Sequence, residues 1–598
     1  IFAPRHALVI AAAMLTVALT FTNGCSGGAG GGVSSGGGSS SGDHTPPTVS
    51  ITSPANNATL SGTVVVTASA TDDVAVASVQ FQVDNTAVGP ALTSAPYSYS
   101  LDTTTLTNGT HTLTAVAVDT SNNTAKSAAI SITVSNAGTP PAVKFPIKAA
   151  SGGRYFVDQN GQPFMIVADA GHHLISAIPQ SSWAAYLSDR QTNGFTAVDV
   201  YAVCSGSGAS GRCPTNAAAY NGSLPFNKTV TTSCDTAMTG PSDADVSCPN
   251  NAYWTEVDTL VQDAATAGLV VILDPLPWGD AFSTTIINNG SSKDYAFGQF
   301  IGNRYKNDTN IIYMLGDDFD QSSFPSDANI GLVAQIMAGI QSVDTNHLIT
   351  CQLNYNLSWS TQANSHSATF ANILTMNLLY DYFQTYDGAS SAWNSSTLPI
   401  WMGEANYETA NNTGGLNQSA NAFITRLQSW YTMTSGGAGF EFGNEHVNHF
   451  DSGYASTSGP CSPTTCLDST ATLQQKYIPA LFSTVPWQTF KPDQSHTVVT
   501  SGYGTYNSST DLNLYDATYA TTTWDGSTTS ITYTPVSTTL TVNLGAFSHP
   551  VTAAWFDPTT GTSTTISGSP FTNSGSQSFT TPAAAHADGT QDWVLVLH

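Results

Sequence analysis

Positive charge is scarce in this sequence, with 14 Lys and Arg against 40 Asp and Glu in 598 residues and a formal net charge of −26. Nucleic-acid binding needs many cationic side chains to neutralise phosphates, so that class of function is excluded. A polybasic contact with an anionic membrane is disfavoured for the same reason. Charged residues make up only 9% of the chain, and Ser, Thr, Asn and Gly supply most of its polarity. This composition favours an extracellular protein with a neutral polar partner such as carbohydrate.

The sequence also lacks the spacing of known metal-binding motifs. No Cys or His spacing matches a zinc site, including that of His172, His446 and His449. The acidic run Asp317, Asp318 and Asp320 is not followed by the Gly and distal Glu of a calcium loop. We therefore expect no metal ion and no cofactor.

Six of the eight cysteines lie in pairs that are close in sequence. This spacing predicts disulfides that constrain loops. The pairs are Cys204 with Cys213, Cys234 with Cys248, and Cys461 with Cys466. Three connectivities remain open among the first four. Cys351 lies in an apolar strand pattern, which predicts a buried free thiol.

The first 45 residues have the pattern of an export signal and a tether. The apolar run 7–21 has the length of a signal-peptide core and is short for a membrane span. Thr22, Asn23, Gly24 and Cys25 follow and resemble a bacterial lipobox, although Leu is usual where Thr22 stands. We expect a signal segment with a lipobox at 1–25, a flexible Gly/Ser tether at 26–45 and a secreted or cell-surface lipoprotein of a bacterium. Ordinary signal cleavage, with Cys25 incidental, is the alternative.

Residues 46–136 alternate short β-runs with turns, which predicts a β-sandwich. The segment resembles bacterial Ig-like modules but lacks the Cys–Trp–Cys pattern of antibody domains. We expect a spacer, with direct glycan binding as the alternative. A Pro-containing linker follows at 137–146.

Residues 147–487 alternate apolar strands with helices, which predicts a (β/α)8 barrel. The expected strands are 163–171, 197–203, 269–276, 311–319, 348–354, 373–380, 399–405 and 437–444. The expected helices are 181–192, 253–267, 295–306, 328–343, 417–432 and 471–482, with weak signals after the fifth and sixth strands. A doubly wound sheet is the alternative. Residues 488–598 are β-rich again and predict a small all-β domain that packs on the barrel.

Two of the barrel strands end in carboxylates that suit glycosidic bond cleavage. The fourth strand ends at Asp317 and Asp318, and the seventh ends at Glu404. Active residues of such barrels lie at the C-terminal ends of strands, and hydrolysis needs a proton donor opposite a second carboxylate. We therefore predict Asp318 and Glu404 as catalytic residues, with Asp317 as the alternative proton donor. Like-charge repulsion from Asp317 would favour the protonated form of Asp318.

Other polar and aromatic side chains follow the expected strands and are predicted to bind substrate. They are Asp169, His172, Tyr201, Trp278, Asp280, Asp317, Tyr380, Asn444, Glu445 and His446. Four Cys residues lie within or directly before the insertion 205–251. We expect this insertion to form one wall of the cleft.

The expected barrel also resembles a known family, the apiosidase-like glycoside hydrolases. The matching segments are 153–164 (GRYFVDQNGQPF), 194–198 (GFTAV), 276–280 (LPWGD), 300–305 (FIGNRY), 310–318 (NIIYMLGDD) and 403–404 (GE). The resemblance implies a retaining (β/α)8 hydrolase with Asp318 as general acid/base and Glu404 as nucleophile. Tail segments 555–561 (WFDPTTG) and 592–595 (DWVL) resemble the β-domain that often follows such barrels.

This chain departs from the family pattern around both carboxylates. The family has Leu-Gly-Gly-Asp where this chain has Asp317 before Asp318, and Pro where it has Ala405. Its first-strand Gly-Asp-Thr becomes Ala168, Asp169 and Ala170. These changes weaken transfer of the family's substrate, so the prediction is a hydrolase of a plant or microbial polysaccharide or oligosaccharide. The alternatives are a non-catalytic surface protein that binds glycan or matrix, and a polysaccharide lyase, which the shortage of Lys and Arg disfavours. Endo and exo action are equally open.

Overall fold

The computed structural model describes most of the chain from residue 43 onward. The described residues are 43–60, 63–103, 106, 109–134, 145–204, 213–214, 216–228, 234, 236–278, 282–319, 327–353, 357–358, 372–410, 419–458, 460–462, 464–507 and 514–598. The expected signal segment, Cys25 and most of the tether lie outside them. Within these ranges, no helix is both long enough and apolar enough to cross a bilayer.

The chain divides into two compact units, Ile1–Asn136 and Ala137–His598. The first unit is a sandwich of two mostly antiparallel sheets, as an Ig-like module predicts. One sheet has the order β1 (Thr48–Ser53), β3 (Thr63–Thr71), β6 (Tyr97–Asp102). The other has the order β2 (Ala58–Leu60), β9 (Ile130–Val134), β7 (Gly109–Asp119), β4 (Val76–Val83), β5 (Thr86–Leu92), with β8 (Thr124–Lys126) on β7. Val79, Phe81 and Val83 alternate inward along β4, which is how a period of two builds one buried face.

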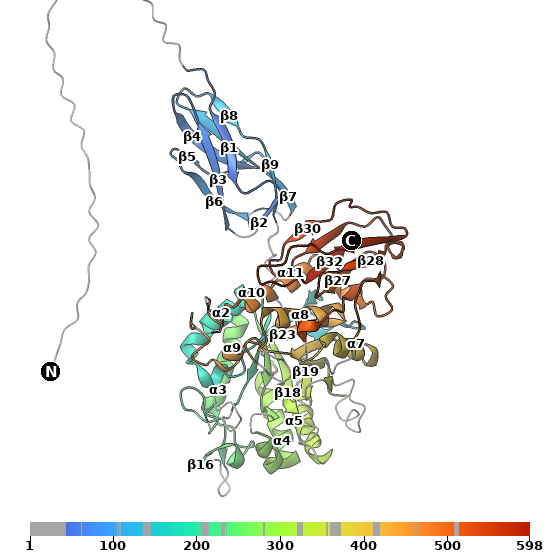
Figure 1. The fold of residues 1–598 in the computed structure, drawn as a ribbon. Coiled ribbons are helices and arrows are strands. Elements are labelled where there is room, and N and C mark those ends of the chain that lie inside the picture. The colour runs from blue at the N-terminus through green and yellow to red at the C-terminus, as the bar shows by residue number, and fades with distance from the viewer. Residues whose placement is uncertain are drawn as a thin grey trace, which may run out of the picture. The chain divides into compact units, whose positions relative to one another are not determined.

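The second unit contains eight parallel strands with helices around them (Figure 1). In chain order the strands are β13 (Ile166–Ala170), β14 (Ala197–Tyr201), β17 (Val270–Asp274), β18 (Ile311–Phe319), β19 (Leu348–Leu353), β21 (Asn377–Tyr380), β22 (Ile400–Glu404) and β23 (Gly437–Phe442). β13 pairs with both β14 and β23, which joins the first strand to the last. Thr375 bridges β19 to the segment before β21, since its N–H donates to the Ile349 carbonyl at 3.0 Å. The (β/α)8 barrel is therefore confirmed over the doubly wound alternative.

The helices that cover the barrel are α1 (Leu174–Ala177), α2 (Trp183–Thr192), α3 (Asn251–Thr266), α4 (Ser283–Tyr305), α5 (Asp327–Gln341), α7 (Thr385–Ser395), α8 (Ala422–Thr434), α9 (Glu445–His449), α10 (Thr470–Gln475) and α11 (Tyr477–Phe482). Each predicted helix overlaps a helix of the structure, although some bounds differ and three further helices, α1, α7 and α9, were not predicted. α4 starts at Ser283, well before residue 295, because a second helical stretch joins it across a kink at Gly290, whose φ is 72°. α7 was not predicted, since its Ser- and Gly-containing sequence has low helix propensity. The single helix expected at 471–482 is two helices, α10 and α11.

One end of the barrel is closed by a small antiparallel sheet of β10 (Lys148–Ala149), β11 (Phe156–Val157) and β12 (Pro163–Phe164). Phe156 and Phe164 join the apolar cluster that fills the barrel interior. β12 leads directly into β13, so this sheet covers the N-terminal ends of the strands. The C-terminal ends lie at the opposite end, where β20 (Leu357–Ser358) pairs with β21 and the hairpin of β15 (Asn227–Lys228) and β16 (Thr236–Ala237) follows β14.

The C-terminal region is all-β and packs on the barrel, as predicted (Figure 1). One sheet has the order β24 (Lys491–Pro492), β26 (Thr521–Trp524), β27 (Ser530–Thr534), β32 (Trp593–Leu597), β29 (Ala553–Phe556), β30 (Ser563–Thr565). The other has the order β25 (Val499–Ser501), β28 (Thr539–Asn543), β31 (Ser576–Thr580). Trp430 of α8 stacks on Tyr533 of β27 with ring centroids 5.8 Å apart.

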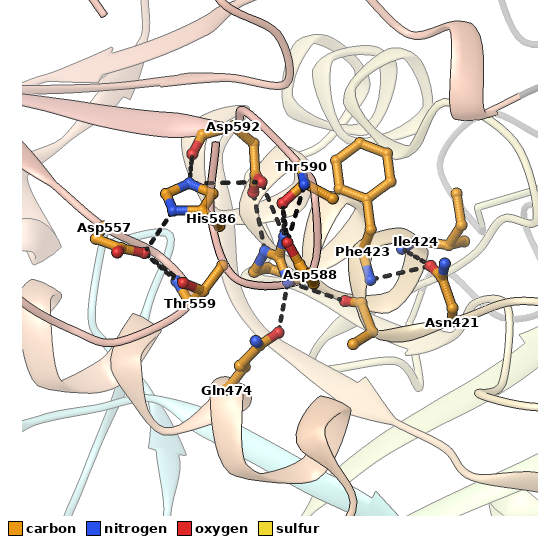
Figure 2. A network of polar contacts seen from close by, with 12 residues as sticks. Asn421, Phe423, Ile424, Gln474, Asp557, Thr559, His586, Asp588, Thr590 and Asp592 are labelled. Atoms are coloured by element: carbon orange, nitrogen blue, oxygen red, sulfur yellow. Dashed lines mark hydrogen bonds and ion pairs between the residues drawn. The ribbon is translucent and has the colours of Figure 1, made fainter. Parts of the chain in front are cut away.

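A buried ion-pair network joins α8 to the last loop of this β-domain. Figure 2 shows Asp588, Thr590, Asp592 and Gln474 gathered around one guanidinium. It belongs to Arg426, whose Nε and Nη2 donate to the two carboxylate oxygens of Asp592 at 2.9 and 2.8 Å. Barrel and β-domain therefore share both apolar and ionic contacts.

All three expected disulfides form, namely Cys204–Cys213, Cys234–Cys248 and Cys461–Cys466. This resolves the connectivity left open among the first four cysteines. Cys351 is a buried free thiol, as predicted, and burial raises the pKa of its thiol.

Candidate functional site

Glu404 is the last residue of β22, and its side chain is only 7% exposed. Two donors, one on β19 and one just after the end of β21, hold its carboxylate. Gln352 of β19 donates from Nε2 to Oε2 at 2.7 Å, and the Tyr382 hydroxyl donates to Oε1 at 2.5 Å. The hydroxyls of Tyr380 and Tyr382 are hydrogen-bonded to each other at 2.6 Å. Both bonds to Glu404 are charge-assisted when it is ionised, so its position and orientation are defined.

The end of β18 has an irregular backbone that brings it close to β19. The register between β18 and β19 shifts between Leu315 and Phe319, so β18 bulges here. Gly316 has a φ of 120°, and a Cβ at this position would lie 2.3 Å from the Gln352 carbonyl oxygen. Asp317 has a φ of 55°, a left-handed backbone conformation that favours Gly and tolerates Asp. The backbone therefore accounts for two glycines in the family pattern and for Asp as a substitute for the second.

The carboxylate of Asp317 faces the barrel interior. It accepts a hydrogen bond from the Tyr201 hydroxyl at 2.5 Å, and its residue is 7% exposed. Burial raises the pKa of Tyr201 well above its ordinary value, and the charges of Asp317 and Glu404 add to the effect. Tyr201 therefore stays a hydrogen-bond donor between the ends of β18 and β22. Asp318 occupies the next position of β18, and its side chain lies outside the described residues.

Two buried acids that sequence reasoning missed lie beside this group. Asp199 is in β14 and Glu441 is in β23, and each is a charged residue inside an otherwise apolar strand, which is the signal that could have identified it. Burial raises the pKa of Glu441 well above its ordinary value, and repulsion from Asp199 and Glu404 raises it further. The Tyr407 hydroxyl donates to Glu441 Oε1 at 3.3 Å, and burial together with Glu404 and Glu441 raises the pKa of Tyr407. Gln352 and Tyr407 were also missed.

His172 completes the cluster from the segment after β13. Its ring stacks on Tyr201 with centroids 4.1 Å apart and an interplanar angle of 14°. Its Nε2 lies 3.7 Å from Asp199 Oδ2 and 3.9 Å from Glu441 Oε1. Of the residues predicted to act on substrate, the structure therefore brings together Glu404, Asp317, Tyr201, Tyr380 and His172.

Asp169, which was predicted to bind substrate, lies elsewhere, on the outer side of β13. Its side chain is completely buried and turned outward from β13 toward α2. It accepts a hydrogen bond from the Tyr186 hydroxyl at 2.6 Å and forms an ion pair with Arg190 at 3.3 Å. Burial raises the pKa of Asp169. Successive side chains of a strand point to opposite faces, which is why the residue beside Ala168 and Ala170 packs against a helix.

The eighth-strand residues are also placed outside the cluster around Glu404. Asn444 is fully buried and caps α9, accepting the N–H of His446 at 3.0 Å while its amide donates to Glu408 at 2.7 Å. These contacts give Asn444 a structural role at the start of α9. His446 pairs with Asp451 at 2.9 Å, and Glu445 lies 3.6 Å from His449. Trp278 packs in an apolar cluster, and Asp280 lies outside the described residues.

Comparisons with known proteins agree with this architecture. A family model described as "Apiosidase-like, catalytic domain" matches residues 150–489, and a "Bacterial Ig domain" model matches 47–115. A model described as "Putative collagen-binding domain of a collagenase" matches 509–598.

Solved structures resemble the fold at low sequence identity. A glycoside hydrolase family 5 protein from Bacteroides vulgatus is 19% identical with a TM-score of 0.59, over 75% of this chain and 93% of that one. A second structure, a glycoside hydrolase, is also 19% identical with a TM-score of 0.58, over 76% of this chain and 97% of that one. At this identity the likeness shows the fold alone. No curated protein matches the chain.

Proposed function

Because this chain belongs to the family of apiosidase-like catalytic domains, we propose that it hydrolyses glycosidic bonds in a plant or microbial polysaccharide or oligosaccharide. The observation that carries the proposal is the setting of Glu404. It ends β22 at the C-terminal end of the barrel, and two donors fix its carboxylate; its charge acts on Tyr201, which donates to Asp317 at the end of β18. A fixed carboxylate opposite a second acid is what glycosidic bond cleavage requires.

In the proposed retaining mechanism, Glu404 is the nucleophile. Its carboxylate attacks the anomeric carbon, the bond to the leaving oxygen breaks, and a covalent glycosyl–enzyme ester forms. Asp318 donates its proton to the leaving oxygen. It then removes a proton from water, which attacks the ester and releases the sugar with its original configuration. Asp317, one residue earlier, is the alternative proton donor.

The groups around Glu404 support this assignment. Tyr382 and Gln352 orient the attacking oxygens, and raised pKa values keep Tyr201 and Tyr407 protonated as donors near neutral pH. Because both phenol groups are neutral, a substrate hydroxyl can hydrogen-bond to them without meeting a further negative charge beside Glu404. His172, Tyr201 and Tyr380 are the proposed substrate contacts.

We also propose that the protein acts outside the cell, as a secreted or cell-surface lipoprotein. Three disulfides and a module similar to bacterial Ig domains support an oxidising location. Replacing Cys25 by Ala in the natural host should release the protein into the medium. Retention of Cys25→Ala protein at the cell surface would exclude lipid attachment at that residue.

The test of catalysis is a screen of aryl glycosides and plant polysaccharides with wild type, Glu404→Ala and Glu256→Ala. Glu256 is a carboxylate of α3 that bonds to Asn221 and Ser223 far from β22, so its variant controls for loss of charge alone. We expect Glu256→Ala to match wild type and Glu404→Ala to lose at least a thousandfold in kcat. Added azide should restore turnover of Glu404→Ala and yield a glycosyl azide of inverted configuration.

Two further variants separate the proton donors. If Asp318 is the proton donor, Asp318→Asn should abolish turnover of substrates with poor leaving groups and spare activated aryl glycosides. If Asp317 is the donor, Asp317→Asn should show this pattern instead. If wild type hydrolyses nothing but binds glycan or collagen as well as Glu404→Ala does, the non-catalytic binding function replaces this proposal.

A further inference from the structure

Three buried side chains from separate strands meet beside Glu404 and offer one ligand atom each. They are His172, which follows β13, Asp199 of β14 and Glu441 of β23, and they are 5%, 0% and 3% exposed. Nε2 of His172 lies 3.7 Å from Asp199 Oδ2 and 3.9 Å from Glu441 Oε1. All three ligand atoms fall within 4.8 Å of one another.

The polar atoms of this cluster lack the partners that burial demands. Among the described residues, no other group donates to His172 Nε2, to either oxygen of Asp199 or to Oε2 of Glu441, and the carboxyl groups of Asp199 and Glu441 lie within hydrogen-bonding reach of each other. The guanidinium of Arg190, on the outer side of β13, is paired with Asp169 and Asp189. Two buried carboxylates without a balancing positive charge are costly, so a cation or a proton must occupy the space between them.

The position of His172 favours a cation over a proton. A proton shared by Asp199 and Glu441 would satisfy two oxygens and leave His172 Nε2 unpaired. The separations of 3.7 and 3.9 Å from that nitrogen are too long for hydrogen bonds. A point equidistant from the three atoms lies about 2.0–2.5 Å from each, close to the bond lengths of divalent ions to nitrogen and oxygen.

We propose that His172, Asp199 and Glu441 bind a divalent cation of the Zn²⁺ type, in which case His172 contacts the ion while Tyr201 and Tyr380 contact the substrate. One imidazole and two carboxylates are a common ligand set for such ions. The stacking of His172 on Tyr201 and the bond from Tyr407 to Glu441 orient two of the ligands, as supporting side chains do in metal sites. The sequence predicted no metal, because residues 172, 199 and 441 are far apart along the chain.

The ion would connect β13, β14 and β23 and offset the charge of Asp199 and Glu441 next to Glu404. Two other groups of potential ligands do not qualify. His173 lies near Cys204 and Cys213, whose sulfurs form a disulfide, and the acids Asp43, Asp72 and Asp73 of the sandwich are partly exposed. Neither group combines burial with free ligand atoms.

The test measures metal content directly and needs no substrate. Purified full-length protein is dialysed against EDTA, reloaded with Zn²⁺, passed through a desalting column and analysed by elemental mass spectrometry. We expect one Zn²⁺ per chain in wild type, and less than one tenth of that in Glu441→Gln and Asp199→Asn. The control is His111→Gln, which removes a His–carboxylate pair from the sandwich and should leave Zn²⁺ binding unchanged.

Wild-type measurements keep the test decisive if those variants do not fold. Zn²⁺ should raise the melting temperature of EDTA-treated wild type by several degrees, because a ligand that binds only the native state stabilises it. Anomalous diffraction at the zinc edge should place the ion between the three side chains. A wild type that retains no ion, or an ion located elsewhere, overturns the proposal and leaves a shared proton as the occupant, whatever the outcome for glycoside hydrolysis.

Discussion

The ion pair between Arg426 and Asp592 allows a test of how burial sets the strength of a contact between barrel and β-domain. Both side chains are essentially buried, at 1% and 0% exposure, and two parallel hydrogen bonds join them. Replacing Arg426 by Met keeps much of the apolar stem and leaves Asp592 buried without its cation. Removing one partner of a buried pair costs about 3–5 kcal/mol.

A matched pair elsewhere in the barrel provides the control. Arg304 contacts Asp258 with the same two-point geometry, at 2.6 and 2.7 Å, but the side chains are 16% and 30% exposed. Exposed pairs contribute about 0–1 kcal/mol, so Arg304→Met should hardly change stability. The two variants share the loss of a two-point arginine–carboxylate contact, and they differ in its burial and in the additional partners of Arg426, which are Asp588, Thr590 and Gln474.

The assay is unfolding in urea and by heat, followed by tryptophan fluorescence. Unfolding entropy grows with chain length, so in the unit Ala137–His598 each kcal/mol corresponds to about 1 °C. We expect Arg426→Met to lower the melting temperature by about 3–5 °C and Arg304→Met by about 1 °C or less. Equal losses for the two variants, or a loss below 1 °C for Arg426→Met, would refute the argument from burial.

Two further predictions concern the site and the pH dependence of stability. Tyr382→Phe removes a hydrogen bond to Glu404 that contributes about 1.5–3 kcal/mol. The value of kcat/KM on the best aryl glycoside should therefore fall about 10–100-fold. A loss below threefold would contradict the role of this hydroxyl. His586 is bonded to Asp557 and to the Asp592 carbonyl (Figure 2). Burial lowers the pKa of His586, but these bonds outweigh it and raise the pKa above 6.5 overall. Its stabilising effect is therefore complete below pH 6.5 and lost as the pH rises through the raised value. The difference in unfolding free energy between wild type and His586→Gln should shrink from pH 6 to pH 9, and a constant difference in urea midpoints would show this reasoning to be wrong.

Much of the architecture followed from local pattern. β18 starts and ends at the predicted residues 311 and 319, and the other barrel strands overlap their predicted ranges, because strands buried on both faces are continuous apolar runs. α7 escaped prediction because tertiary packing stabilises a segment with weak intrinsic propensity. The segments that resemble the family include β11, β12 and the end of β18, which are constrained by barrel closure and by the bulge at Gly316.

The candidate site was predictable where chemistry coincides with a strand end. Glu404 and the Asp317–Asp318 pair were identified because the end of a barrel strand is where reactive groups lie. The same rule selected Asp169, whose side chain contacts α2, since a strand position alone does not say which face a side chain takes until the register is known. Asp199 and Glu441 were missed because they are interior residues of their strands.

The sequence by itself determined the class of each domain, the disulfide-rich character of the chain and the two strands that carry the carboxylates. These properties depend on residue periodicity and composition, which are local. The tertiary structure alone decided which side chains share a space, since His172, Asp199 and Glu441 become neighbours only when β13 pairs with both β14 and β23. Barrel closure creates that proximity, and with it the buried negative charge from which the cation site was inferred.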